Sequence, residues 1–105
     1  MSMDDRRNEF ESRYARDQEL LFRIEARRNK LVGLWAAGKL GKEGAEAEAY
    51  AQEVLKASFA RPGEEGVFDK VRADFDAANV DQSDHQIRRQ LAESFSEAER
   101  QITAG

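Results

Sequence analysis

Apolar residues recur in steps of three and four along the first 39 residues of the chain, a spacing that predicts one long amphipathic helix. The stripe has two charged interruptions and consists of Phe10, Tyr14, Asp17, Leu21, Ile24, Arg28, Leu31 and Trp35. Glycines at positions 38 and 41 can take the left-handed conformation that closes a helix, so the helix should end within residues 38–41. From residue 4 to residue 39, such a helix is about 54 Å long.

Three shorter amphipathic helices are predicted to follow, each bounded by a start or stop signal. The first begins near Glu43 and ends before residues 61–63, because Pro62 cannot continue the hydrogen-bond ladder. The next ends at residues 79–81, and the last begins at Ser83, which forms a capping box with Gln86. Their apolar faces are, in chain order, Ala47, Tyr50, Ala51, Val54, Leu55 and Phe59; Val67, Phe68, Val71, Phe75 and Ala78; and Ile87, Leu91, Phe95, Ala98 and Ile102.

These patterns predict an all-α protein that folds as a four-helix bundle in one domain. The second and fourth helices would span only about 24 to 30 Å, so they cannot cover the first. We therefore expect residues 20–105 to form the four-helix core and residues 1–19, here called the N-terminal arm, to protrude from it. The arm has only Phe10 and Tyr14 as large apolar groups, so we expect it to be partly disordered until a partner covers them.

The composition excludes several classes of chemistry. The chain has no cysteine and one histidine, so disulfides and zinc clusters lack ligands, and we expect neither a metal nor a cofactor. The N-terminus is too charged for a signal peptide, and no segment approaches the roughly 20 apolar residues that span a bilayer. We therefore expect a cytoplasmic protein without direct membrane insertion. A net charge of −4 argues against nucleic-acid binding.

Two short motifs suggest catalysis but are better explained by helix ends. Residues 33–39 satisfy the phosphate-loop pattern G-x-x-x-x-G-K, yet Leu40 stands where a serine or threonine should bind magnesium. Ser83, Asp84 and His85 are the residue types of a hydrolytic triad, but neighbouring helical positions point about 100° apart and cannot converge on one atom. We expect a helix end and a helix cap at these places.

Two acidic pairs could also suggest general acids. They are Glu64 with Glu65 and Asp74 with Asp76. A general acid needs a desolvated carboxyl with a raised pKa, and nothing in the sequence supplies that burial. We expect solvated charges here, and a protein that is not an enzyme.

Two basic clusters leave a second function open. Arg27, Arg28 and Lys30 lie on the first helix, and Arg88 and Arg89 lie on the fourth. If the clusters came together, the arginines could hold the phosphates of a weakly bound nucleotide, as in a small helical sensor protein. The preferred interpretation is that they neutralise nearby carboxylates.

Three longer runs carry a resemblance to a known family. Residues 25–37, 70–78 and 83–89 resemble the zeta subunit of alphaproteobacterial F-type ATP synthases, in the same order and spacing, and the resemblance covers essentially the whole chain. It implies a four-helix protein, peripheral to the membrane-bound synthase, that inhibits ATP hydrolysis.

The resemblance also implies where the inhibitor acts. The N-terminal segment would enter a catalytic interface between the alpha and beta subunits, near the gamma subunit of the rotor, and block rotation. The residues to which this role carries over are Met3, Asp4, Asp5, Arg6, Arg7, Phe10, Arg13 and Tyr14. Family members often have phenylalanine at positions 3 and 14, and Met3 and Tyr14 preserve the apolar bulk.

Overall fold

The first helix extends far beyond the other three. The computed structural model describes the backbone of residues 3–104 and the side chains of residues 17–104. Its helices are α1 (Met3–Lys39), α2 (Gly44–Ala57), α3 (Glu65–Ala77) and α4 (Asp84–Ala104). Within the described residues these four helices are the only regular elements, which confirms the all-α, four-helix prediction.

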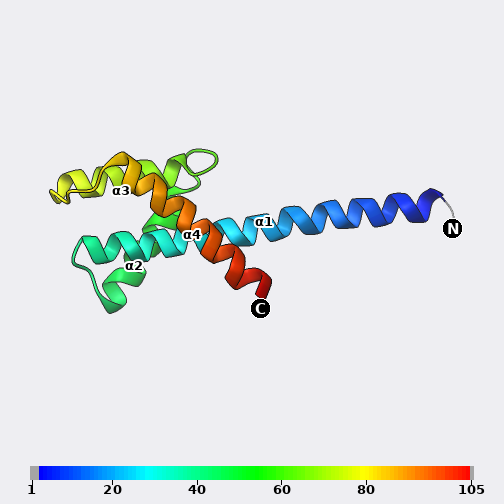
Figure 1. The fold of residues 1–105 in the computed structure, drawn as a ribbon, viewed down its shortest axis with the longest axis horizontal. Helices are drawn as coiled ribbons and strands as arrows, with labels where there is room; N and C mark the ends of the chain where they lie inside the picture. The colour runs from blue at the N-terminus through cyan, green and yellow to red at the C-terminus, as the bar shows by residue number, and fades with distance from the viewer. Residues whose placement is uncertain (1–2, 105) are drawn as a thin grey trace.

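The bundle forms around the C-terminal half of α1 (Figure 1). Helices α2 and α4 pack against this half, and α3 completes the bundle. The N-terminal half of α1 projects alone, and the molecule measures 62 × 25 × 21 Å as a result. The predicted protrusion is therefore present, and α1 is helical along it from Met3 onward.

All four helices contribute to one apolar core. The ring of Trp35 in α1 packs edge-on against Phe75 of α3, with ring centroids 5.6 Å apart. Phe75, Ile87 and Leu91 are fully buried. The core residues are Val32, Ala36, Ala37, Tyr50, Val54, Val67, Val71, Phe75, Ile87 and Leu91.

Full burial of the described α1 side chains begins at Ile24. Ile24 is the first buried side chain among those described, with 4% of its surface exposed, whereas Leu21 is 46% exposed. The helical stripe is continuous in sequence, but the side chains of α1 are only partly covered at Leu20 and become fully buried at Ile24.

Two helices end in the same hydrogen-bonded turn. At the end of α1, Gly41 takes a φ of +80° and the Lys42 amide donates to the Ala37 carbonyl at 2.8 Å, as the glycine at position 41 predicts. At the end of α3, Asn79 takes a φ of +58° and the Val80 amide donates to the Phe75 carbonyl at 2.9 Å. Val80 then packs on the core.

Two residues assigned to apolar faces lie outside their helices. Helix α2 ends at Ala57, and Phe59 is 72% exposed in the following turn, so its predicted place on the apolar face is wrong. The backbone of Gly66, at the start of α3, packs directly against Ala57, and the chain turns there to bring α3 back over α2. Ala78 is likewise exposed, because α3 ends at Ala77.

Candidate partner-binding site

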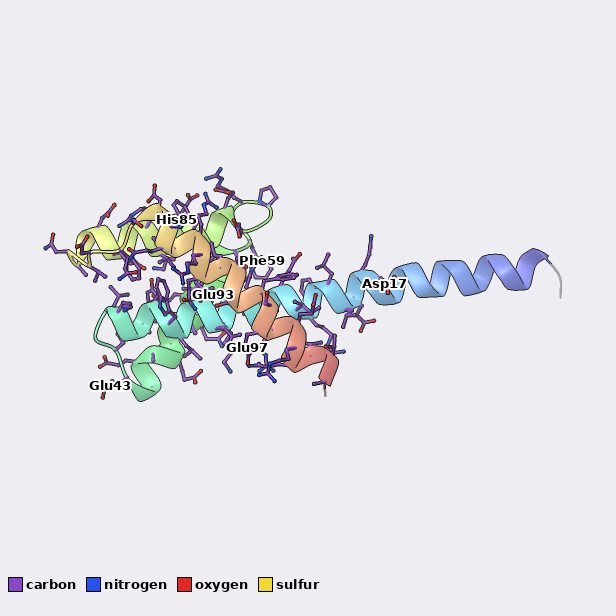
Figure 2. All side chains as sticks on the ribbon, viewed as in Figure 1. Asp17, Glu43, Phe59, His85, Glu93 and Glu97 are labelled. Carbon is purple, nitrogen blue, oxygen red and sulfur yellow. The ribbon has the colours of Figure 1, made fainter. Side chains whose placement is uncertain are left out.

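The protruding half of α1 contains every residue predicted to contact a partner. Residues 3–14 lie in this helix, and their side chains fall outside the described residues. The first side chains described, including Asp17, are exposed and stand clear of the bundle (Figure 2). A single helix of this kind lacks tertiary packing and is marginally stable in water, so a partner groove would supply its missing contacts.

The packed half of α1 holds the protruding half in place. Val32, Ala36 and Ala37 are completely buried, and no glycine or proline interrupts the helix before Gly33. Gly33 itself sits where α1 crosses α2, since a Cβ at this position would lie 2.8 Å from the Cα of Ala51. The protruding helix is thus a continuous extension of the most deeply packed element.

This crossing also explains the phosphate-loop pattern. Residues 33–39 lie inside α1, as expected for a helix end, and Gly33 is used for close helix packing. Such a segment has its amides bonded within the helix and cannot wrap a phosphate.

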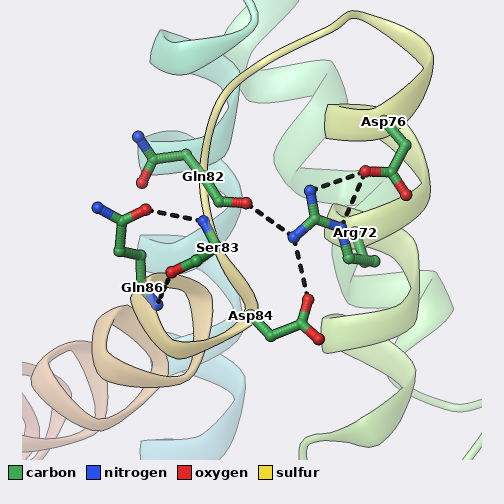
Figure 3. Close-up of polar contacts among 6 residues, drawn as sticks. All are labelled: Arg72, Asp76, Gln82, Ser83, Asp84 and Gln86. Atoms are coloured by element: carbon green, nitrogen blue, oxygen red, sulfur yellow. Dashed lines mark hydrogen bonds and ion pairs between the residues drawn. The ribbon is translucent and has the colours of Figure 1, made fainter.

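The Ser83–His85 segment is a helix cap, as predicted. The Gln86 amide donates to the Ser83 hydroxyl at 3.1 Å, and the Ser83 amide donates to the Gln86 side-chain oxygen at 2.7 Å (Figure 3). His85 is exposed in the first turn of α4. Arg72 of α3 stabilises the same turn by donating to Asp84 at 3.0 Å.

Both acidic pairs keep part of their side-chain surface in solvent, and both are also neutralised by basic partners. Arg88 donates to Glu64 at 3.0 Å and to Glu65 at 2.9 and 3.1 Å. These hydrogen bonds from Arg88 lower the pKa of Glu65. A carboxyl with a lowered pKa stays ionised, which is the opposite of what a general acid requires.

The second acidic pair is also bonded. Asp74 accepts a hydrogen bond from the buried Tyr50 hydroxyl at 2.7 Å and an ion pair from Lys70 at 3.0 Å. Burial, together with the hydrogen bond to Asp74, raises the pKa of Tyr50. Asp76 pairs with Arg72 at 2.8 Å. The bond between Tyr50 and Asp74 joins α2 to α3, whereas the two ion pairs lie within α3.

The two basic clusters do not come together. Arg28 is buried with its guanidinium 6.0 Å from the ring centroid of Phe95, and Arg27 donates to Gln101 at 3.1 Å. Arg88 lies 13 residues before Gln101 on α4, a separation of about 20 Å along the helix. Arg89 pairs with Glu93 at 3.1 Å.

The Arg88 guanidinium is committed within the bundle. It lies 3.9 Å from the ring centroid of Phe68, in addition to its bonds with Glu64 and Glu65. Bonds to these two carboxylates raise the pKa of Arg88, although partial burial opposes the shift. The cation therefore neutralises carboxylates, as the preferred interpretation holds, and is not free for a phosphate.

Two other kinds of site are absent from the part of the chain that the structure describes. No group of three or more histidine, aspartate or glutamate side chains is arranged there to hold a metal ion. None of the described helices has the length and apolar character to cross a bilayer. The protruding helix, which lacks tertiary packing, is thus the feature that a partner would stabilise most.

Comparison with known sequence families identifies the family of this chain. The sequence model of the family described as ATPase inhibitor subunit zeta matches residues 1–101. The chain belongs to the ATPase inhibitor subunit zeta family. As an inhibitor subunit, it associates with the ATP synthase.

The fold agrees with that of a solved structure. A chain described as "Solution NMR structure of the protein" is 43% identical, with a TM-score of 0.70. The match covers 79% of this zeta-family chain and 94% of the solved one. The search of curated proteins returned no match.

Proposed function

We propose that this protein inhibits ATP hydrolysis by the F-type ATP synthase by inserting its N-terminal arm at a catalytic interface between the alpha and beta subunits, near the gamma subunit. The observation that carries the proposal is the lone protrusion of α1 from the bundle (Figure 1) in a chain of the zeta inhibitor family.

In this proposal the N-terminal arm becomes fully ordered as it binds in the groove. In a helix, Phe10 and Tyr14 are one turn apart, so both can occupy apolar pockets along one groove. Arg6, Arg7 and Arg13 flank them and can pair with carboxylates of the enzyme. Aromatic and arginine side chains are the types that dominate interface energies.

The bundle limits how far the arm can enter. A bare helix is about 10 to 12 Å wide with its side chains, whereas the bundle is 25 × 21 Å in cross-section. A groove that admits α1 must therefore stop the chain near Ile24, where packing begins. The 21 residues from position 3 to position 23 give a wedge of about 31 Å.

The wedge performs no chemistry. It inhibits by binding one rotational state of the enzyme better than the others, because a ligand shifts an equilibrium only by its differential affinity. The nucleotide-sensor alternative gains no support from a structure in which Arg88 is paired with carboxylates and lies far from Arg27.

Substitution of the two aromatic anchors tests the mechanism. Phe10→Ala with Tyr14→Ala should raise the concentration for half-inhibition of ATP hydrolysis by about 30-fold or more, the usual cost of losing interface hot spots. His85→Ala, at an exposed position of the bundle outside the arm, is the control and should inhibit like the parent. Unchanged inhibition by the double variant would refute the proposed insertion.

A further inference from the structure

Three large apolar side chains in the described part of the chain are strongly exposed, and all three lie where α1 leaves the bundle. Leu21 is 46% exposed, Phe22 62% and Phe59 72%. Phe22 belongs to α1, whereas Phe59 belongs to the turn after α2. Figure 2 shows Phe59 beside the exit of α1. Apolar groups that gather in this way usually mark an interaction surface.

Phe22 and Phe59 border the same open cavity. It has a volume of about 170 Å³, and its lining includes Ala26 and Leu55 beside the two phenylalanines, with Glu25 and Arg28 among its polar lining residues. An apolar cavity of about 150 Å³ holds one benzene molecule. The space therefore suits a single aromatic or aliphatic side chain with a polar rim around it.

The position of the cavity selects its occupant. Phe22 lies eight residues after Tyr14 on one uninterrupted helix, about 12 Å along its axis. Residues 3–32 contain no glycine or proline that could act as a hinge. If the arm enters a groove of the synthase, the cavity is carried to the mouth of that groove.

We propose that Phe22 and Phe59 form a second anchor, which takes one apolar side chain of the ATP synthase at the mouth of the groove that the arm enters. This inference rests on the proposed insertion of the arm. A second copy of the chain is the competing occupant, and the test below distinguishes the two.

The second anchor would fix the orientation of the arm. Leu21 is 11 residues after Phe10, which returns it to nearly the same face of the helix, whereas Phe22 is turned by about 100° from that face. Contacts on two faces define the rotation of α1 about its axis, and contact at Phe59 defines the depth of insertion. The arm then presents Phe10 and Tyr14 in one register only.

The test measures the binding of three full-length variants to the purified synthase, alongside the parent. Phe22→Ala with Phe59→Ala removes the second anchor, Phe10→Ala with Tyr14→Ala removes the arm contacts, and His85→Ala is the control at an exposed ring elsewhere on the bundle. We expect a rise in Kd of about tenfold or more for the first variant and no change for the control. Because Phe22 and Phe59 are exposed, the melting temperature should stay near that of the parent.

The outcomes separate the two proposals. If the variant at positions 22 and 59 binds like the parent while the variant at positions 10 and 14 does not, the second anchor is wrong and the arm mechanism stands. If the variant at positions 10 and 14 keeps full inhibition, the arm mechanism itself is wrong.

A photo-crosslink reports on the occupant without removing any contact. Phe59→p-benzoylphenylalanine should yield an adduct with a synthase subunit on irradiation of the complex. An adduct only with a second copy of the chain, or dimerisation of the parent that is lost in the variant at positions 22 and 59, would overturn the proposal. Absence of any adduct with the synthase would also contradict it.

Discussion

Gly33 of α1 lies so close to Ala51 of α2 that an added Cβ would fall 2.8 Å from the Ala51 Cα. The contact is backbone against backbone, so neither helix can yield by rotating a side chain. It sets the separation between α2 and the helix that carries the arm.

Substitution of Gly33 should therefore destabilise the bundle. Gly33→Ala forces the two helices apart and should lower the free energy of unfolding by about 1 to 3 kcal/mol, the usual cost of overpacking. Urea denaturation measures the change. Gly38→Ala is the matched control, since nothing lies within 4 Å of a Cβ there. Removing a glycine from a helix should leave this control as stable as the parent or about 0.5 to 1 kcal/mol more so. Equal stability of the two variants would contradict the close crossing.

The turn after α3 gives a test of backbone conformation. Asn79 has a φ of +58°, a region in which asparagine is tolerated, glycine is favoured and alanine is strained. Asn79→Ala should lower the free energy of unfolding by about 1 kcal/mol, and Asn79→Gly should be nearly neutral. Thermal denaturation of the pair checks this. A glycine variant as destabilised as the alanine variant would show that the Asn79 side chain matters more than its backbone.

The ion pair between α3 and α4 predicts a pH dependence of stability. Hydrogen bonds from Arg88 hold the pKa of Glu65 below its ordinary value of 4.5. A carboxyl with a lower pKa in the folded state stabilises the fold above its unfolded pKa and loses that contribution as the pH falls through its folded pKa. Glu65→Gln should therefore be less stable than the parent at pH 7, and the difference should shrink as the pH falls below about 4.5.

The measurement for this pair is the melting temperature from pH 7 to pH 3. Glu48→Gln, at an exposed position of α2, controls for the loss of one negative charge. A constant difference between the Glu65 variant and the parent over the whole range would mean that the ion pair does not supply the stability.

The sequence alone predicts the features that depend on local chemistry. The capping box of Ser83 and Gln86 is visible in a spacing of three residues, and the left-handed turn at Gly41 is visible in the glycine itself. The same helical period predicts the core faces of α3 and α4 apart from Ala78 at the end of α3. The length of α1 relative to the other helices predicts its protrusion.

Features that depend on contacts between distant residues could not be predicted in this way. Phe59 continues the helical period of α2, but the helix ends at Ala57, where Gly66 packs so tightly that an added Cβ would clash with the Ala57 carbonyl oxygen. The bond between Arg88 and Glu65 joins residues 23 positions apart. The exposure of Phe22 depends on where the other helices stop, which no local pattern records.

The most direct test of the central claim is the rate of ATP hydrolysis by the synthase of the source organism, titrated with the full-length chain and with a variant that lacks residues 1–14. Among the side chains that the structure describes, the buried core begins at Ile24, so the shortened chain should keep its melting transition and helical bundle. The account predicts inhibition by the full-length chain and none by the shortened one at the same concentrations. Full inhibition by a folded chain without residues 1–14 would contradict it.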